Sequence, residues 1–255
     1  MVLRFGSLPL TWSYDNNDEK ADFLRGYVRN YLKEEILEEQ IVRQIDAFKD
    51  FLEVAAQSSG DIINYSKIAR DVGSSDQTVK SFYQVLEDTL IGFSLPAFHR
   101  SIRKRQREAP KFYLFDLGVK SALERTLKIP LEKRTSSYGK AFEHFVILEI
   151  FRMCEYLQND YRLSYLRTKD NAEIDLVIER PGKPDLLLEI KSTEKVTEDD
   201  VRTVSRFSKE WDKEAVGQVW SQDNLSKKIN EVSCYHWREG FNKLFLDDSK
   251  TKKLD

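Results

Sequence analysis

The spacing of apolar residues in the first half of the chain predicts helices followed by two strands. Apolar positions in residues 18–57 recur at helical spacing with charged faces opposite, which predicts two helices. Residues 62–90 read as three shorter helical pieces. The segments 90–98 (LIGFSLPAF) and 111–116 (KFYLFD) are strand-like, and the basic stretch HRSIRKRQREAPK separates them.

The pattern changes from residue 138 onward. Residues 138–157 form a long apolar stretch that predicts a helix. Thr197 followed by Asp200 resembles a capping box and predicts the start of a second helix. Alternating or continuous apolar runs predict strands at 163–169, 173–180, 185–192, 216–220 and 232–237. A helix-strand-strand-strand-helix-strand order of this kind predicts a mixed sheet flanked by helices.

Residues 65–89 (YSKIARDVGSSDQTVKSFYQVLEDT) predict two helices joined by a turn at Gly73. Ser74 or Ser75 can cap the second helix. With the basic hairpin that follows, these helices predict a winged helix that reads duplex DNA with its second helix. The candidate nucleic-acid-binding residues are Gln77, Thr78, Lys80, Arg100, Arg103, Lys104, Arg105 and Arg107. A winged helix used for protein contacts is the alternative, because the second helix carries few basic residues.

The two strands of residues 173–191 (EIDLVIERPGKPDLLLEIK) carry charges among apolar residues. Strand side chains alternate between faces, so Asp175 and Val177 should share one face and Ile174 the other. Glu189 and Lys191 should likewise share a face of the second strand. Whether they form one site depends on whether Asp175 and Glu189 lie opposite each other in the hairpin.

The length of the turn sets which residues of the two strands are paired. A three-residue loop at Pro181-Gly182-Lys183 would pair Arg180 with Pro184 and place Asp175 directly opposite Glu189. Carboxylates on directly opposed residues, with Cβ atoms ~4.5–5.5 Å apart, destabilise a sheet unless a cation lies between them.

Mg²⁺ is the cation that this arrangement favours, since it binds one or two carboxylates and keeps waters for a substrate phosphate. Asp175 and Glu189 are therefore the candidate metal ligands. Lys191 could orient or help deprotonate an attacking water and stabilise charge on a phosphate. Glu143, on the apolar helix 138–157, is a candidate supporting ligand or base, and we expect it to be partly buried.

A solvent-exposed face with a Lys–carboxylate pair is the alternative for these residues, because charges on strands usually mark such a face. Glu173, Glu179 and Glu194 are assigned to a solvent-exposed face in this way.

Net charge, cysteine content and hydropathy limit the kind of protein that this chain can be and its location in the cell. The net charge of −2 excludes a uniformly basic nucleic-acid-binding surface, so such contacts must come from local patches. Cys154 and Cys234 have no disulfide-framework or zinc spacing, which is typical of a reducing cytoplasm. The N-terminus lacks a signal-peptide pattern, and no apolar stretch approaches the ~18 residues of a membrane span. We expect a soluble cytoplasmic protein with no membrane partner.

In that order along the chain, Glu143, Asp175 and Glu189-Ile190-Lys191 resemble the PD-(D/E)XK nuclease superfamily over roughly residues 138–246. The resemblance implies a restriction-endonuclease-like mixed sheet and a Mg²⁺-dependent phosphodiesterase site. The chain has Ile174 where the superfamily name places proline.

The wider chain, from GSLPL through KFYLFD to YGKAFEHFVILEI and LEIKS, is similar to the C-terminal part of a family of prokaryotic AAA-type ATPases. That resemblance implies a winged helix followed by a nuclease-like domain of unknown function. The chain contains no G-x-x-x-x-G-K-[ST] motif, so we expect no ATP site in it and an ATPase partner in trans.

The predicted fold class is α+β, with a helical segment 1–57, a winged-helix domain 58–127, a restriction-endonuclease-like domain 138–246 and a flexible tail 247–255. The first functional hypothesis is a DNA-binding, Mg²⁺-dependent deoxyribonuclease. The second is a non-catalytic DNA- or protein-recognition module of an ATPase, and the third is a regulatory DNA-binding protein that uses only the winged helix.

Overall fold

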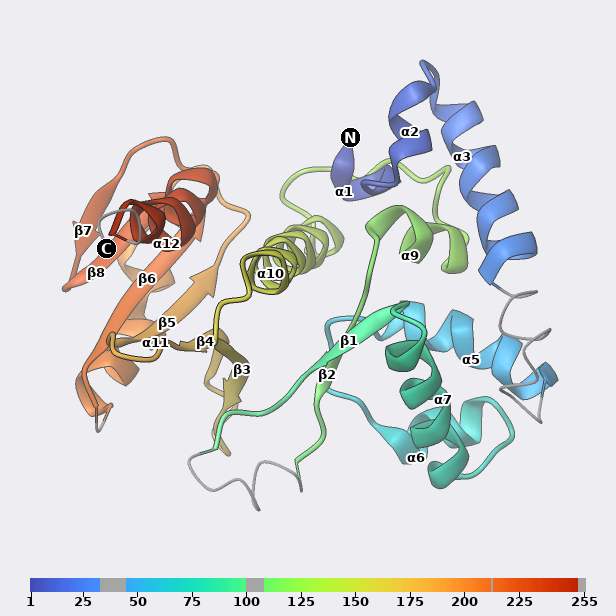
Figure 1. The fold of residues 1–255 in the computed structure, drawn as a ribbon, viewed down its shortest axis with the longest axis horizontal. Helices are drawn as coiled ribbons and strands as arrows, with labels where there is room; N and C mark the ends of the chain where they lie inside the picture. Colours follow the sequence, from blue (N-terminus) through green and yellow to red (C-terminus); the bar gives the residue numbers. More distant parts are fainter. Residues whose placement is uncertain (33–44, 100–107, 212, 252–255) are drawn as a thin grey trace. The chain divides into compact units, whose positions relative to one another are not determined.

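A computed structural model describes residues 1–32, 45–99, 108–211 and 213–251 (Figure 1). The chain divides into two compact units. Unit 1 comprises Met1–Leu95 and Ala109–Glu132, and unit 2 comprises Pro96–Glu108 and Lys133–Asp255.

Unit 1 is mainly helical, and its only β-ladder among the described residues is a two-stranded antiparallel one. Its elements are α1 (Val2–Phe5), α2 (Pro9–Ser13), α3 (Asn17–Gly26), the π-helix η1 (Tyr27–Leu32), α5 (Ile45–Gln57), α6 (Tyr65–Asp71), α7 (Asp76–Asp88), β1 (Gly92–Leu95), β2 (Lys111–Leu114) and α9 (Leu117–Leu123). The predicted strands of this half are confirmed, and so are the helices predicted within 18–57 where the structure describes them, while residues 33–44 lie outside the described residues.

Residues 62–90 contain two helices, so the prediction of three was wrong. Ile62 is extended and bridges Lys111 of β2, which removes it from any helix. The remaining helix boundaries follow local chemistry. The Asn64 side chain accepts a hydrogen bond from Lys67 N at the start of α6, and Ser75 caps α7 by accepting one from Thr78 N.

The turn between α6 and α7 has the predicted glycine. Gly73 has a φ of 63°, a left-handed conformation that glycine adopts without a Cβ clash. On either side of it, Ile68 and Val72 of the first helix and Val79 and Leu86 of the second are buried in one cluster. This packing fixes the predicted helix-turn-helix arrangement.

Asp116 holds the first residues of unit 1 in place. It is 1% exposed, caps α9 through Gly118 N and Val119 N, and accepts a hydrogen bond of 2.6 Å from Ser7 N. Gly6 has a φ of 70°, and a Cβ built there would lie 2.0 Å from Asp116 Oδ1. Asp116, which follows β2, therefore joins the backbone of Gly6-Ser7 to the start of α9.

Unit 2 contains a mixed sheet, as predicted, with six strands where the sequence predicted five. Its elements are α10 (Ser136–Leu157), β3 (Arg162–Arg167), β4 (Glu173–Glu179), β5 (Asp185–Ile190), α11 (Glu198–Glu210), β6 (Ala215–Ser221), β7 (Lys227–Ile229), β8 (Val232–His236) and α12 (Trp237–Thr251). The strand order is β3-β4-β5-β6-β8-β7. Strands β3, β4 and β5 pair antiparallel, β5 pairs parallel with β6 and β6 with β8, and β7 pairs antiparallel with β8.

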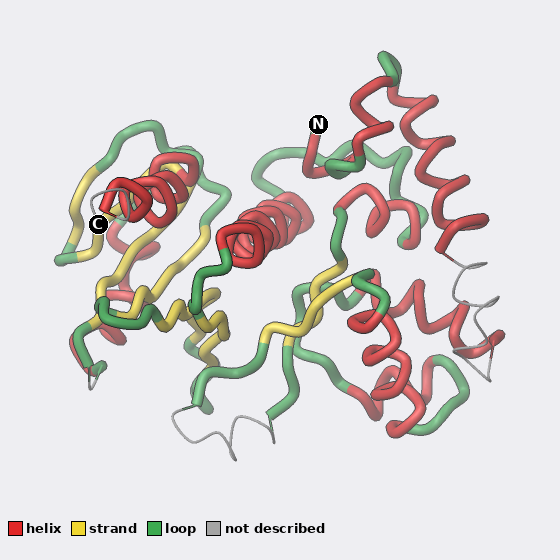
Figure 2. Tube along the Cα trace, viewed as in Figure 1, coloured by secondary structure: helices red, strands yellow, loops and turns green. Residues whose placement is uncertain are grey.

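The helices of unit 2 lie beside this sheet (Figure 2). The predicted capping box of α11 is present, with Thr197 N bonded to the Asp200 carboxylate at 2.8 Å. Val201 and Val204 of α11 pack with Leu187 of the sheet in one buried cluster. Strand β7 was not predicted, because the three residues Lys-Lys-Ile are too short to show alternation.

Candidate functional site

The hairpin of β4 and β5 has the predicted register. Leu176 pairs with Leu188 and Ile178 with Leu186, and Asp175 and Glu189 are the next residues along the two strands. Gly182 has a φ of 74°, and Lys183 N donates to Arg180 O at 3.1 Å. The three-residue turn is therefore formed, and the two strands keep the predicted register as far as Leu176 and Leu188.

Strand β4 contains an irregularity between Ile174 and Val177. Val177 pairs with Ser164 and Ile174 with Leu166, so three steps along β4 oppose two steps along β3. One extra residue between them explains why Ile174 packs in the same cluster as Val177. The predicted placement of Ile174 on the opposite face was wrong for this reason.

The irregularity coincides with an unusual bond to Asp175. Bulges commonly redirect a side chain near a functional site. Asp175 is 9% exposed, and its Oδ2 accepts a hydrogen bond of 2.7 Å from the backbone N–H of Ile190. One carboxylate oxygen is thus tied to the strand that carries Glu189.

Glu189 is the most constrained carboxylate of the hairpin. It is 7% exposed, and its Oε1 lies 2.5 Å from Lys191 Nζ. Its Oε2 is buried with no hydrogen-bond partner among the residues that the structure describes. The pKa of Glu189 is raised: burial is the largest cause, the Lys191 ammonium opposes it, and the charges of Glu143 and Glu173 raise the pKa further.

Lys191 stays protonated in this environment. Burial acts to lower the pKa of Lys191, but the carboxylates of Glu189, Asp175 and Asp200 together raise it. Its side chain is 38% exposed. A charged ammonium can orient a water or stabilise a phosphate, but it cannot accept a proton. The charge of Lys191 therefore favours stabilisation of a phosphate over deprotonation of a water.

Glu143 lies on α10 and is half-buried, as expected. Its charge reaches Glu189 strongly enough to raise the pKa of that residue. Glu173 does the same, so its assignment to a solvent-exposed face was incomplete: it is half-buried and contributes to the electrostatics of the site. Its position two residues before Asp175 on one strand was the signal that could have found it.

The described residues hold no ready-made three-ligand cage. Within residues 1–32, 45–99, 108–211 and 213–251, no group of three or more His, Cys, Asp or Glu side chains is arranged to hold a metal ion. The candidate metal ligands are therefore two carboxylates, Asp175 and Glu189. The Oε2 atom of Glu189 is the one without a hydrogen-bond partner among the described residues. A pair is within the range that Mg²⁺ uses when waters complete its shell.

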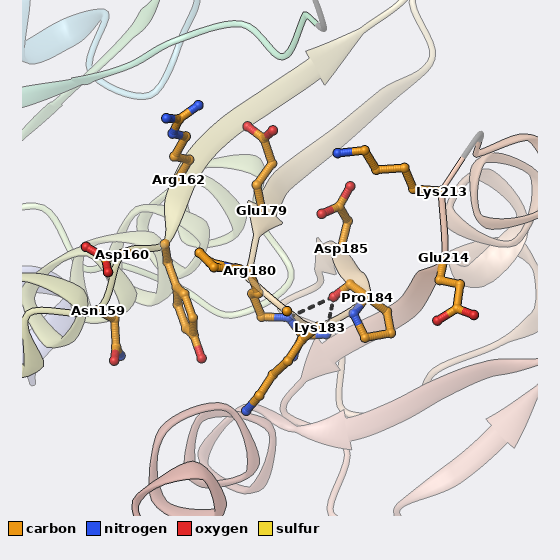
Figure 3. Close-up of a pocket in the computed structure, with 13 residues that line it drawn as sticks. Asn159, Asp160, Arg162, Glu179, Arg180, Lys183, Pro184, Asp185, Lys213 and Glu214 are labelled. Carbon is orange, nitrogen blue, oxygen red and sulfur yellow. Dashed lines mark hydrogen bonds between the residues drawn. The ribbon is translucent and has the colours of Figure 1, made fainter. Parts of the chain in front are cut away.

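A cleft lies at the other end of the same hairpin (Figure 3). The Arg180 guanidinium crosses the turn there and bonds Pro184 O at 2.6 and 3.0 Å. Charges of both signs line the cleft, and neither Asp175 nor Glu189 does so. The lining residues are Asn159, Asp160, Tyr161, Arg162, Glu179, Arg180, Pro181, Gly182, Lys183, Pro184, Asp185, Lys213 and Glu214.

The candidate nucleic-acid-binding residues of α7 lie near its N-terminus. Gln77 and Lys80 are exposed, and Thr78 is half-buried beside the cap at Ser75. Asp76, in the first turn, adds a negative charge to this face. The other candidates, Arg100, Arg103, Lys104, Arg105 and Arg107, lie outside the described residues.

The first 132 residues match the family model described as a domain of unknown function (DUF8612), which covers residues 1–132. This chain belongs to the DUF8612 family. A second model, also a domain of unknown function (DUF4143), matches residues 138–239 of this DUF8612 protein. DUF4143 is found in AAA-ATPase-associated proteins, so the match supports an ATPase-associated protein, the coarser part of the resemblance drawn from the sequence.

Two curated mycobacterial proteins are similar to this DUF8612 protein. They are Uncharacterized protein Rv2008c of Mycobacterium tuberculosis and Uncharacterized protein Mb2031c of Mycobacterium bovis. Each is 27% identical over 183 residues, which cover 70% of this chain and 40% of the relative. The match therefore spans less than half of the length of either relative.

Among solved structures, a chain in a refined half-complex from a tetradecameric assembly of Thermococcus gammatolerans McrB AAA+ hexamers with bound McrC is similar at a TM-score of 0.29. The identity is 14%, and the match covers 78% of this chain and 53% of that chain. A TM-score of this size carries no argument about fold or function. In the described part of the chain, no helix is both long and apolar enough to cross a membrane.

Proposed function

We propose that unit 2 carries a Mg²⁺-dependent phosphodiesterase site of the restriction-endonuclease-like type, acting on DNA. The observation that supports this most directly is Glu189 Oε2, a buried carboxylate oxygen without a hydrogen-bond partner among the described residues, on the strand whose Ile190 N–H donates to a second buried carboxylate, Asp175. Such an oxygen is costly to bury unless it is paired or ligated. A divalent cation would satisfy it.

The residues fit Mg²⁺. Asp175 and Glu189 would hold the ion through oxygen atoms, and Glu143 would support them from α10. When bound, the ion would lower the pKa of a water and polarise a phosphoryl oxygen. Lys191, already an ammonium, would orient the water and stabilise the charge that develops on the phosphate.

Unit 1 is the proposed DNA-binding part, a winged helix. Helices α5, α6 and α7 are followed by the β1–β2 ladder, and Ile62 adds a bridge to β2. This order of elements supports placing α7 in the major groove, with the basic segment between β1 and β2 on phosphates. The proposal includes an ATPase partner in trans and a cytoplasmic location, which two buried free cysteines support.

Metal binding tests this function. Calorimetric titration of the full chain with Mg²⁺ or Mn²⁺ should show one site, and Asp175→Ala should lose it. The same two proteins should differ in cleavage of plasmid and single-stranded DNA. Absence of both binding and cleavage in the wild-type chain would end the proposal.

A non-catalytic recognition module of an AAA-type ATPase is the second candidate. Two observations favour it: the described residues hold no three-ligand group, and Asp76 lies on the DNA-reading face of α7. Binding of a DNA duplex at several salt concentrations separates the two roles of unit 1. Each phosphate contact should add ~0.9 to the slope of log affinity against log salt. A slope near zero would favour protein recognition.

A further inference from the structure

Two loops of unit 2 are joined directly after the proposed catalytic strand. The segment 191–196, which follows β5, runs beside residues 220–223 at the end of β6. Three hydrogen bonds hold the loops together: Lys191 N to Trp220 O at 2.9 Å, Gln222 N to Thr193 O at 3.0 Å, and Val196 N to Asp223 Oδ2 at 3.0 Å. The first of these begins at Lys191 itself.

Asp223 is the central group of this contact. It is 5% exposed, and both of its oxygens are used. Oδ1 accepts from Leu225 N at 3.0 Å, while Oδ2 accepts from Val196 N and lies 2.7 Å from Lys227 Nζ. The hydrogen bond from Lys227, with those from the two backbone N–H groups, lowers the pKa of Asp223 to about 2. Asp223 is therefore ionised at neutral pH.

Gln222 extends the same contact to α10. Its Nε2 lies 3.0 Å from the hydroxyl of Tyr138, in the first turn of that helix, and its Oε1 lies 3.3 Å from the same hydroxyl. Helix α10 also carries Glu143. Residues 222 and 223 thus join three parts of the candidate site: the loop after Lys191, the end of β6 and the helix of Glu143.

We propose that Asp223 is a positioning residue of the Asp175–Glu189–Lys191 site. By holding Val196 N, it keeps the segment 191–196 against β6, and the backbone of Lys191 stays where its ammonium reaches Glu189. Lys191 is a long and partly exposed side chain, so a mobile backbone would let the ammonium leave the carboxylate. Groups that orient direct ligands commonly affect metal affinity and activity by about 10–100-fold. This inference rests on the proposed function.

The test compares four variants in the full chain. Asp223→Ala removes the acceptor, Asp223→Asn keeps a neutral acceptor, and Lys227→Met removes only the ion pair. Lys228→Met is the matched control, because Lys228 is the next residue of β7 and forms its ion pair with the exposed Glu231. The measurements are Mn²⁺ affinity by calorimetry, kcat and KM for plasmid cleavage, and hydrogen exchange of the Val196 amide.

We expect folded Asp223→Ala to bind Mn²⁺ about 10–100-fold more weakly. Its kcat should fall while its KM for DNA stays unchanged, since the loss lies in the reacting geometry rather than in substrate binding. The Val196 amide should exchange faster. Asp223→Asn and Lys227→Met should show smaller losses in the same direction, and Lys228→Met should match the wild type.

The outcomes separate this inference from the proposed function. A wild type that binds Mn²⁺ and cleaves DNA, with folded Asp223→Ala equal to it in affinity and kcat, overturns the positioning role and leaves the function intact. A general loss of folded protein would lower the active fraction without changing the measured Mn²⁺ affinity. If Asp223→Ala does not fold, Asp223→Asn decides by the same measurements, and no change in it overturns the role. A wild type without binding or cleavage ends both.

Discussion

Replacing Glu189 with glutamine should stabilise the metal-free protein at neutral pH. Glutamine keeps the shape of the side chain and removes its charge. At neutral pH the buried Oε2 carries part of the carboxylate charge without a hydrogen-bond partner among the described residues, and a neutral amide in its place removes the charged share of a desolvation penalty of about 1–3 kcal/mol. The ion pair with Lys191 returns only about 0–1 kcal/mol, because the lysine side chain is 38% exposed. The net gain for Glu189→Gln is therefore about 1 kcal/mol.

The pH dependence of this gain follows from the raised pKa of Glu189. Its pKa in the folded state lies above the ordinary 4.5. A group with a raised pKa contributes stability that is present below its unfolded pKa and is lost as pH rises through its folded pKa. Glu189→Gln should therefore gain most at pH 7 and little at pH 4, where the wild-type carboxyl is protonated.

Thermal unfolding with EDTA measures the effect, with an expected rise in Tm of about 3 °C at pH 7 for a domain of this size. Glu194→Gln is the control, because Glu194 is exposed and its pKa is lowered by Lys133. It should show no gain at pH 7. A lower Tm for Glu189→Gln at both pH values would refute the reasoning and make the Lys191 ion pair the dominant contribution. With Mn²⁺ added, the wild-type Tm should rise and that of Glu189→Gln should not.

Three further predictions concern packing and charge. Gly6→Ala should lower the free energy of unfolding, measured in urea, by about 2 kcal/mol or more, because a Cβ there would lie 2.0 Å from Asp116 Oδ1 at a φ of 70°; an unchanged urea midpoint would contradict this contact. Gly240→Ala should cost about 1–3 kcal/mol through overpacking against Trp220, whose Nε1 would lie 2.3 Å away, and tryptophan fluorescence during unfolding would report it. Ionised Asp223 stabilises the wild type above pH 3.8, and this stabilisation is lost as the pH falls toward 2. Asp223→Asn should lack it, so the free energies of unfolding of the two proteins in urea should converge in acid. A constant difference would contradict the lowered pKa of Asp223.

The hairpin register could be predicted from residues 173–191 alone. Alternation assigns each side chain to a face, and a three-residue Pro-Gly-Lys turn sets which residues oppose each other. Both are short-range properties of the chain. The caps at Ser75 and Thr197 were predictable for the same reason, since a cap joins residues only three positions apart.

The irregularity between Ile174 and Val177 could not be predicted in this way. It arises from how β4 pairs with β3, and nothing within β4 marks the extra residue. Strand β7 was also missed, since its pairing with β8 rather than its own sequence makes it a strand.

The sequence by itself determined the long helices and strands, the register of β4 and β5 set by their turn, and the caps at Ser75 and Thr197. These features depend on neighbours a few residues apart, whose geometry the local chain dictates. Tertiary structure decided that Glu189 Oε2 would be buried without a partner among the described residues, and that Asp223 would hold a backbone N–H 27 residues away. Burial and long-range hydrogen bonds depend on which distant segments pack together, and the pattern of a single segment does not contain that information.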